Sequence, residues 1–261
     1  MKKEKSPYSI VAISFVVTLS ALIIVIMLVL SATVMGRKEE VKEENDLSMS
    51  YYTPDDGDSF KLLLIRCREK SEPPVSYTVL EFLPERCEIN LINIPVDMKV
   101  TVNTKTDTLN GHYDYAGSSN AKIAAGNILL SDVDRYVRID DRGFTNIVDA
   151  LGGIEKTFPK AYKGDGVSIP VGNHLLNGKT VLKLLEEAPN EIFYSFEDFL
   201  KSLMEEKLKK ADTIKGDYLF TVFVNNVDTD ITQFDFASHK KALRYFAESE
   251  ERKINLKKAE S

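Results

Sequence analysis

The sequence predicts an α/β domain with a mixed central β-sheet between helical layers, preceded by one N-terminal transmembrane helix. Near the N-terminus lies a run of 26 uncharged, mostly apolar residues. Three apolar runs of strand length then follow in quick succession between residues 61 and 94, and amphipathic segments alternate with further strand-like runs after residue 119. Because strands and helices interleave irregularly, a three-layer mixed domain is favoured over a strictly alternating, doubly wound one.

Residues 10–35 contain neither a charge nor a proline. About 20 apolar residues suffice to cross a bilayer, so this run can span it with some tilt. A cleaved signal peptide is the main alternative, but the run is longer than the usual ~7–15 apolar residues and no clear A-x-A site follows. We therefore expect an uncleaved anchor that holds the protein in the membrane.

The orientation of the anchor depends on few charges. The basic residues before the span are Lys2, Lys3 and Lys5, and those just after it are Arg37 and Lys38. Since orientation follows the count of Lys and Arg, residues 1–9 are predicted to be a short cytoplasmic tail and the globular domain to lie outside the cell membrane.

The rest of the chain divides into an acidic linker, residues 36–59, and a domain, residues 60–261. About 200 residues can bury a sizeable core. The net charge of −6 offers no basic surface for nucleic acid, and the three histidines and two cysteines form no metal-binding pattern, so no cofactor is expected. Cys67 and Cys87 could form one disulfide or remain two buried thiols.

The domain is predicted to open with strands over 61–67, 76–83 and 88–94, separated by proline-containing turns, as an antiparallel meander. Residues 119–130 are expected to be helical, capped by Ser118 or Ser119, and residues 135–139 to form a short strand.

In the second half, a helix is expected to begin at Asp141 as its cap and to end at Gly152, followed by a strand over 154–158. Asn177 is predicted to cap a helix over 178–187, which Pro189 stops. Further predicted segments are an amphipathic helix over 195–211, a helix or strand over 217–226, and a last helix over 242–252.

Six segments, in order, resemble motifs of the LytR-CpsA-Psr family of cell-envelope proteins. Their sequences are KLLLIRC, SYTVLEF, INLINIPVDMKV, TLNGHYDYAG, DRYVRIDDRGFTNIVDALGGIEKTFP and VGNHLLNGKTVLKLL, and together they cover roughly residues 60–210. The resemblance implies a mixed sheet between helical layers on a single N-terminal anchor. It also implies transfer of a glycopolymer from a polyprenyl pyrophosphate carrier to the cell wall, aided by magnesium. Such chemistry requires arginines and carboxylates for the charged head and an apolar groove for the lipid.

Most charged positions of the family pattern are replaced here. The aspartate closing the first strand falls on Cys67 or Arg68, and the Pro-Arg-Asp step keeps only Asp97 of its two charged residues. The family's Arg-Ser-Asp motif falls on Val75–Tyr77. Its Tyr-x-Arg-x-Arg motif falls on Leu184–Ala188, which contains Glu186 and Glu187. Its Asp-x-x-Arg-x-x-Arg-Gln motif falls on residues 195–207, which contain no arginine. Carboxylates in place of phosphate-binding arginines would repel a pyrophosphate, so the ordinary transferase reaction is expected to be lost and the chain to be a pseudoenzyme.

Arg66, Arg68 and Asp97 are the residues of this region that could still bind an anionic ligand. The alternative interpretation places Arg66 and Arg68 on one solvated face of a strand end and makes Asp97 a backbone hydrogen-bond acceptor. Four aromatic residues could line a lipid groove or belong to the core: Phe193, Tyr194, Phe196 and Phe199.

Three functions remain open on the sequence. The leading hypothesis is a non-catalytic envelope protein that binds a polyprenyl-linked intermediate or an envelope-assembly partner. The second is a phosphotransferase with a site rearranged around Arg66, Arg68 and Asp97. The third is a structural or interaction module.

Overall fold

The computed structural model describes residues 52–164, 166–209, 222–223 and 225–260. The predicted span at residues 10–35 lies outside this range, as does most of the segment 217–226. None of the helices within the described range has the length and apolar character needed to cross a bilayer.

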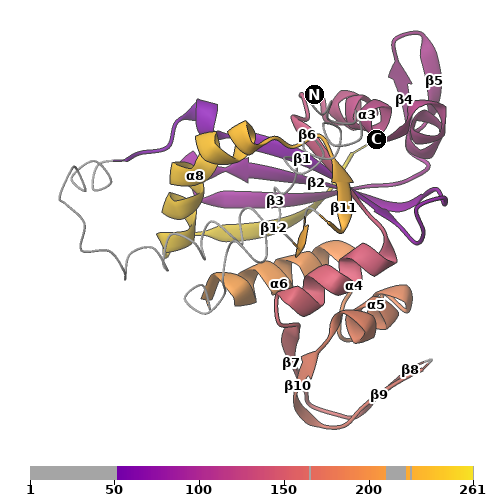
Figure 1. The fold of residues 1–261 in the computed structure, drawn as a ribbon, viewed down its shortest axis with the longest axis vertical. Helices are drawn as coiled ribbons and strands as arrows, with labels where there is room; N and C mark the ends of the chain where they lie inside the picture. Colours follow the sequence, from indigo (N-terminus) through magenta and orange to yellow (C-terminus); the bar gives the residue numbers. More distant parts are fainter. Residues whose placement is uncertain (1–51, 165, 210–221, 224, 261) are drawn as a thin grey trace, which may run out of the picture.

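The centre of the domain is a six-stranded mixed sheet with the order β11-β6-β1-β2-β3-β12 (Figure 1). The first three strands along the chain, β1, β2 and β3, pair antiparallel, which confirms the predicted meander. Strands β6 and β12 join β1 and β3 in parallel, and β11 pairs antiparallel with β6. The bounds are Phe60–Cys67 (β1), Pro74–Leu83 (β2), Glu88–Ile94 (β3), Arg135–Ile139 (β6), Val227–Thr229 (β11) and Lys253–Lys258 (β12).

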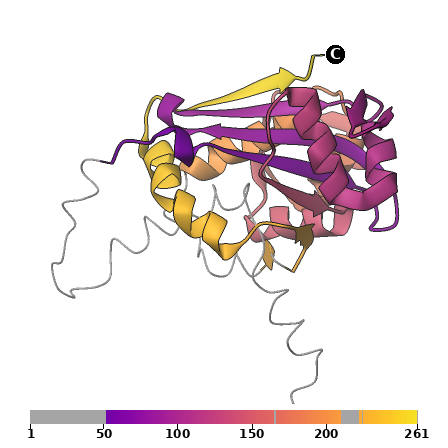
Figure 2. The ribbon, with the colours of Figure 1, turned by 90° about the horizontal axis from the view of Figure 1, so that it is seen from above.

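Helices cover both faces of the sheet and create two hydrophobic cores (Figures 1 and 2). One face packs against α3 (Leu109–Leu129), and the other side carries α4, α5, α6 and α8, of which α5 packs on α4. The latter helices span Asp141–Ala150, Gly178–Glu186, Phe196–Lys209 and Gln233–Glu248. The predicted mixed α/β class with a sheet between helical layers is therefore confirmed.

Most of the short strands outside the main sheet were not predicted from the sequence. They form three two-stranded ribbons: β4 (Lys99–Val102) with β5 (Lys105–Thr108), β7 (Ile154–Phe158) with β10 (Gly172–Leu176), and β8 (Tyr162–Gly164) with β9 (Val167–Ile169). Only β7 was predicted, because three- to five-residue strands carry too few alternations to show a period of two.

Three helix boundaries were predicted incorrectly. Helix α3 begins at Leu109 with Thr108 as its cap, ten residues before the expected start, and non-helical backbone at Ala116 and Gly117 interrupts it just before the expected cap. The cap of α4 is Asp140, whose side chain accepts a hydrogen bond from Gly143 N at 2.7 Å. The last helix ends at Glu248, and β12 follows as the sixth strand of the sheet.

A row of polar side chains crosses the face of the sheet that packs against α3. Lys61 pairs with Glu81 at 3.3 Å, Asn90 donates to Glu81 at 2.8 Å, and Asn255 donates to Asn90 at 3.1 Å. These residues face one another in the registers of four adjacent strands. Because Asn90 is fully buried, its bonds favour this register over a slipped one.

The two cysteines are free and lie at opposite ends of the sheet. Cys67 ends β1 and pairs with Pro74, the first residue of β2. Cys87 directly precedes Glu88, which pairs with Leu83, the last residue of β2. The ten-residue length of β2 places them roughly 30 Å apart at ~3.3 Å per residue. A Cys67–Cys87 disulfide is therefore excluded, because bridged cysteines need Cα atoms within ~7 Å.

Candidate functional site

An apolar cavity lies between the sheet and helices α4 and α6. Its walls are entirely apolar: Leu64, Val137, Ile139, Phe144, Ile147, Val148, Leu151, Phe196, Phe199, Leu200, Leu203 and Phe223. The free volume is about 40 Å³, little more than the ~30 Å³ that one water molecule occupies in the liquid. In this conformation the cavity would have to open to admit a lipid chain.

Of the four aromatic residues that could line a lipid groove or belong to the core, Phe193 and Phe199 are buried in the core and Phe196 packs against it. Phe196 and Phe199 line the cavity, and Phe193 packs edge-on against Phe199 at a centroid distance of 5.3 Å. Tyr194 is 69% exposed and takes no part.

A buried ion pair lies at one end of the cavity. Arg66 lies two residues beyond Leu64 on the same face of β1, and its guanidinium sits 5.8 Å from the centroid of Phe196. Its Nη2 donates to Asp141 Oδ1 at 3.1 Å, and only 9% of its side chain is exposed. The expectation that Arg66 occupies a solvated strand face is thus wrong, because α6 covers that face.

Two donors at this end are buried without hydrogen-bond partners: Arg66 Nε and Ser76 Oγ. Arg66 and Ser76 are directly opposite in the register of β1 and β2, so their side chains leave the sheet on the same face. Buried donors are rarely left unpaired in folded proteins, which makes this position a candidate binding site for a small anionic or polar group.

Next to these donors is a satisfied polar network. Glu197, at the start of α6, is 3% exposed, and its Oε1 accepts from Thr78 Oγ1 at 2.6 Å and Asn93 Nδ2 at 2.9 Å. The sequence analysis missed it, since a glutamate in the first turn of an amphipathic helix is typical of a solvated position.

The carboxylates around Arg66 raise the electrostatic cost of binding an anion. Burial raises the pKa of the Asp141 carboxyl above its ordinary value, Arg66 opposes this rise, and Glu186 adds to it. Glu186 thus lies near the pair, where the family pattern has an arginine-rich segment. Loss of the arginines predicted from the sequence therefore coincides with negative charge at the site.

The structure places Arg68 beside the pair and Asp97 farther away. Arg68 is exposed, its carbonyl accepts from Asp141 N at 3.2 Å, and its charge lowers the pKa of Asp141. Asp97 is exposed in the turn after β3, at the same edge of the sheet but on the far side of β2. Within the described ranges, no three His, Cys, Asp or Glu side chains cluster so that they could hold a metal ion.

His112 has a structural role. It is 1% exposed, and its Nε2 lies 3.0 Å from the carbonyl oxygen of Val100, which joins α3 to β4. His174 packs edge-on against Phe158 in the β7–β10 ribbon, away from the Arg66–Asp141 pair.

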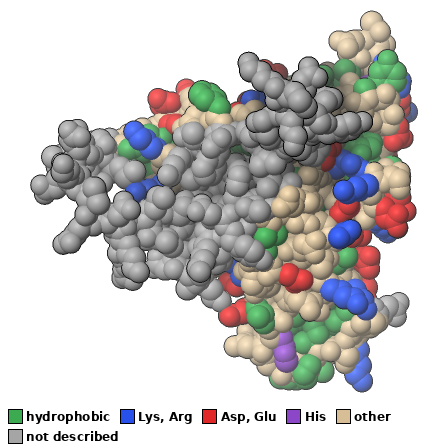
Figure 3. Space-filling model, viewed as in Figure 1, with side chains coloured by type: hydrophobic (Ala, Val, Ile, Leu, Met, Phe, Trp, Pro, Cys, Tyr) green, Lys and Arg blue, Asp and Glu red, His purple; other side chains and the backbone are tan. Residues whose placement is uncertain are grey.

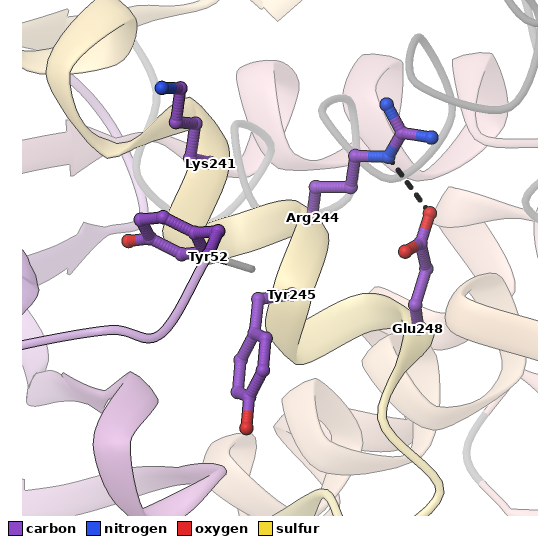
Figure 4. A pocket seen from close by; sticks show the side chains of 5 residues that line it. All are labelled: Tyr52, Lys241, Arg244, Tyr245 and Glu248. Carbon is purple, nitrogen blue, oxygen red and sulfur yellow. Dashed lines mark hydrogen bonds and ion pairs between the residues drawn. The ribbon is translucent and has the colours of Figure 1, made fainter. Parts of the chain in front are cut away.

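Two other hollows differ in character from the cavity. One of about 530 Å³ lies beside the start of α4 and is lined by polar and charged side chains from Lys70 to Asp228, including Arg138, Asp140 and Arg142. The other, of about 90 Å³, lies on α8 (Figure 4). Its Arg244 is paired with Glu248 at 2.8 Å, and its two tyrosines, Tyr52 and Tyr245, contact each other edge-on. Acidic and basic side chains are interspersed over the described surface visible in Figure 3.

The fold and site define a three-layer mixed α/β domain with a small apolar cavity beside a buried arginine. The model of the LytR_cpsA_psr family matches residues 30–192, and the chain belongs to this family.

Similar proteins and structures agree with this assignment. The chain is 26% identical over 246 residues to the polyisoprenyl-teichoic acid–peptidoglycan teichoic acid transferase TagU of Bacillus licheniformis, covering 88% of this chain and 79% of that protein. Identity to TagU of Bacillus subtilis strain 168 is 27% over 203 residues, covering 72% and 66%.

Two solved structures share the fold. One is a putative transcription regulator from Eubacterium siraeum, with a TM-score of 0.63 and 14% identity over 85% of this chain and 90% of that one. The other is TagT bound to LI-WTA, with a TM-score of 0.53 and 17% identity over 84% and 82%.

Proposed function

We propose that this protein is a membrane-anchored, extracytoplasmic member of its family that binds a polyprenyl-linked glycopolymer intermediate during cell-envelope assembly without the ordinary transferase reaction. The observation that carries the proposal is the apolar cavity lined by Phe196, together with the buried Arg66 beside Phe196, whose Nε and the Oγ of the facing Ser76 have no hydrogen-bond partner. An apolar tail and an anionic head on one ligand would satisfy both parts at once, and the large polar hollow beside α4 could take the attached glycan.

Catalytic loss is inferred from charge. Transfer from a pyrophosphate needs cationic groups and a metal ion at the developing negative charge. Here Asp141 and Glu186 lie beside Arg66, and the described residues contain no carboxylate cluster suited to magnesium. The membrane anchor at residues 10–35 would keep the cavity near a lipid carrier.

The test is to purify the full-length chain from bacterial membranes with mild detergent and to record its native mass spectrum. A co-purifying polyprenyl phosphate is the expected result. In parallel, the chain is assayed for transfer of lipid-linked teichoic acid to peptidoglycan with Bacillus subtilis TagU as positive control. An empty protein would contradict the binding role, and transfer at TagU-like rates would contradict the loss of catalysis.

A phosphotransferase with a rearranged site is the second candidate, because Arg66, Arg68 and Asp97 all lie at one edge of the sheet. Alanine at Arg66 is a poor test, since it would also leave Asp141 without its partner. Arg68→Ala is a cleaner test because Arg68 is exposed. Loss of transfer in this variant without loss of thermal stability would favour the second candidate.

A further inference from the structure

Among the described residues, the two most exposed large apolar side chains lie at the same end of the domain. They are Leu130, which caps the C-terminus of α3 and is 93% exposed, and Phe234, in the first turn of α8, which is 78% exposed. The start of β1 lies close to both. The Phe60 ring is 5.0 Å from the ring of His239 on α8, and Lys61 Nζ donates at 2.7 Å to the side chain of the residue that follows Leu130. Single exposed apolar residues are common, so their shared position gains meaning only from further observations.

The first such observation is a stripe along α8. Phe234, Lys241 and Tyr245 are spaced by seven and four residues, so they lie on one face of the helix, and all three are exposed. Tyr52 packs edge-on against Tyr245, with 6.2 Å between the ring centroids. Figure 4 shows Lys241 and Tyr245 projecting from α8 beside Tyr52. The chain that precedes Tyr52 therefore joins the domain next to this stripe.

The second observation is the length of chain between this point and the predicted membrane span. The span ends at residue 35, so Tyr52 follows it by 17 residues and can lie no farther than about 60 Å from it. The α8 end of the domain is thus the tethered end, whereas the β8–β9 ribbon lies at the opposite end in Figure 1. A tether raises the effective concentration of the bilayer at α8, so a weak contact there is sufficient.

The third observation is the distribution of charge along α8. Lys241 is exposed and has no ion-pair partner among the residues that the structure describes. Near its C-terminal end, by contrast, α8 carries Glu248, paired with Arg244 at 2.8 Å, and it contacts the acidic turn η2 (Asp56–Asp58). Aromatic and basic side chains are the types enriched where proteins meet the surface of a bilayer. Anionic lipid headgroups would therefore be attracted to the N-terminal half of α8 and repelled by the other end.

We propose that the N-terminal half of α8 rests on the outer surface of the bilayer and orients the domain. Phe234 enters the headgroup region, Lys241 faces an anionic lipid phosphate, and Leu130 lies at the edge of the contact. This inference rests on the proposed membrane anchor. Because β1 runs from this end toward Arg66, the contact turns the large polar hollow beside α4 away from the membrane, toward the cell wall.

The chain contains no tryptophan, so Phe234→Trp introduces a single fluorescent reporter at an exposed position. The full-length variant is reconstituted in liposomes of phosphatidylcholine and phosphatidylglycerol, with or without lipids brominated near the headgroup. We expect the brominated lipids to quench its fluorescence and the emission to lie at shorter wavelength than in detergent-free water. The matched control is Tyr194→Trp, because Tyr194 is 69% exposed and lies just before α6, near Arg66 at the other end of β1. Its emission should not be quenched.

A second variant tests the charge. Lys241→Gln, made in the Phe234→Trp background, should lower the ratio of docked to undocked domain about fivefold, which corresponds to the ~1 kcal/mol that one lysine contributes near an anionic leaflet. Lys163→Gln on β8 is the control, since Lys163 is also exposed but lies far from α8. Liposomes of phosphatidylcholine alone should reduce the quenching in the same direction as Lys241→Gln.

The outcomes separate this inference from the proposed anchor. If the protein floats with the liposomes but Phe234→Trp is not quenched, or if Tyr194→Trp is quenched equally, the oriented contact is overturned and the anchor stands. If the protein does not float with the liposomes, both are overturned. Emission of Phe234→Trp that shifts to shorter wavelength without bromine quenching, and only at high protein-to-lipid ratio, would assign the stripe to a second copy of the chain instead of lipid.

Discussion

Filling the apolar cavity should stabilise the protein and weaken its lipid binding at the same time. Val148 on α4 is 1% exposed and lines the cavity, whose free volume of about 40 Å³ can take one extra methylene. Burying a methylene contributes about 0.8 kcal/mol. In a domain of this size, that gain corresponds to a rise in melting temperature of roughly 2–3 °C. Val148→Ile is therefore expected to raise the melting temperature.

The same methylene would occupy space that a prenyl chain needs, so the affinity for farnesyl monophosphate should fall. The chain contains no tryptophan, so thermal unfolding is followed by far-UV circular dichroism and binding by calorimetry. The control is Val79→Ile, because Val79 is fully buried in the core on the other face of the sheet. Overpacking that core should cost about 1–3 kcal/mol.

Two results would refute this reasoning. If Val148→Ile lowers the melting temperature as much as Val79→Ile does, the cavity is not usable space. If the melting temperature rises but farnesyl monophosphate binds as before, the prenyl chain lies elsewhere.

Three further predictions concern stability. Asp235→Asn should cost about 1–2 kcal/mol by removing the Arg135 pair and half of a capping box. Although burial opposes the shift, Arg135 and Thr232 hold the pKa of Asp235 below its ordinary value. The stability from these contacts is therefore present above ~pH 4 and is lost as the pH falls through the lowered pKa. Urea unfolding should show a smaller difference in stability between wild type and variant at pH 3 than at pH 7, and a constant difference would contradict the prediction. Gly178→Ala should cost about 1–3 kcal/mol, because the Cβ of the alanine would lie 2.7 Å from the Cα of Thr145. An unchanged midpoint of urea unfolding would show that α4 and α5 can separate at little cost. Tyr162→Phe should cost about 1 kcal/mol, because it removes the 2.8 Å hydrogen bond from the Tyr162 hydroxyl to Glu187. In the wild type, burial and Glu187 raise the pKa of Tyr162 to about 12. A melting temperature equal to that of the wild type would mean that the bond contributes no net stability.

The candidate site was only partly predictable. Arg66 was identified from its place at the end of a strand, but its burial was not, because alternation shows which face a side chain takes and not which helix covers that face. Ser76 and Glu197 gave no signal of their own. A serine in a strand and a glutamate in a first helical turn are ordinary until α6 packs over the sheet and buries them.

The sequence by itself determined the class of fold, the meander of β1–β3, and the caps and ends of helices such as α5, because these follow from local hydrophobic period and capping chemistry. It also predicted that most charged positions of the family pattern are replaced. Only the tertiary structure decided that Cys67 and Cys87 lie at opposite ends of the sheet and that β12 completes the sheet. It also decided that Arg66 and Ser76 face each other on adjacent strands as buried, unpaired donors. These features depend on contacts between residues far apart in the chain, and local sequence patterns carry no information about such contacts.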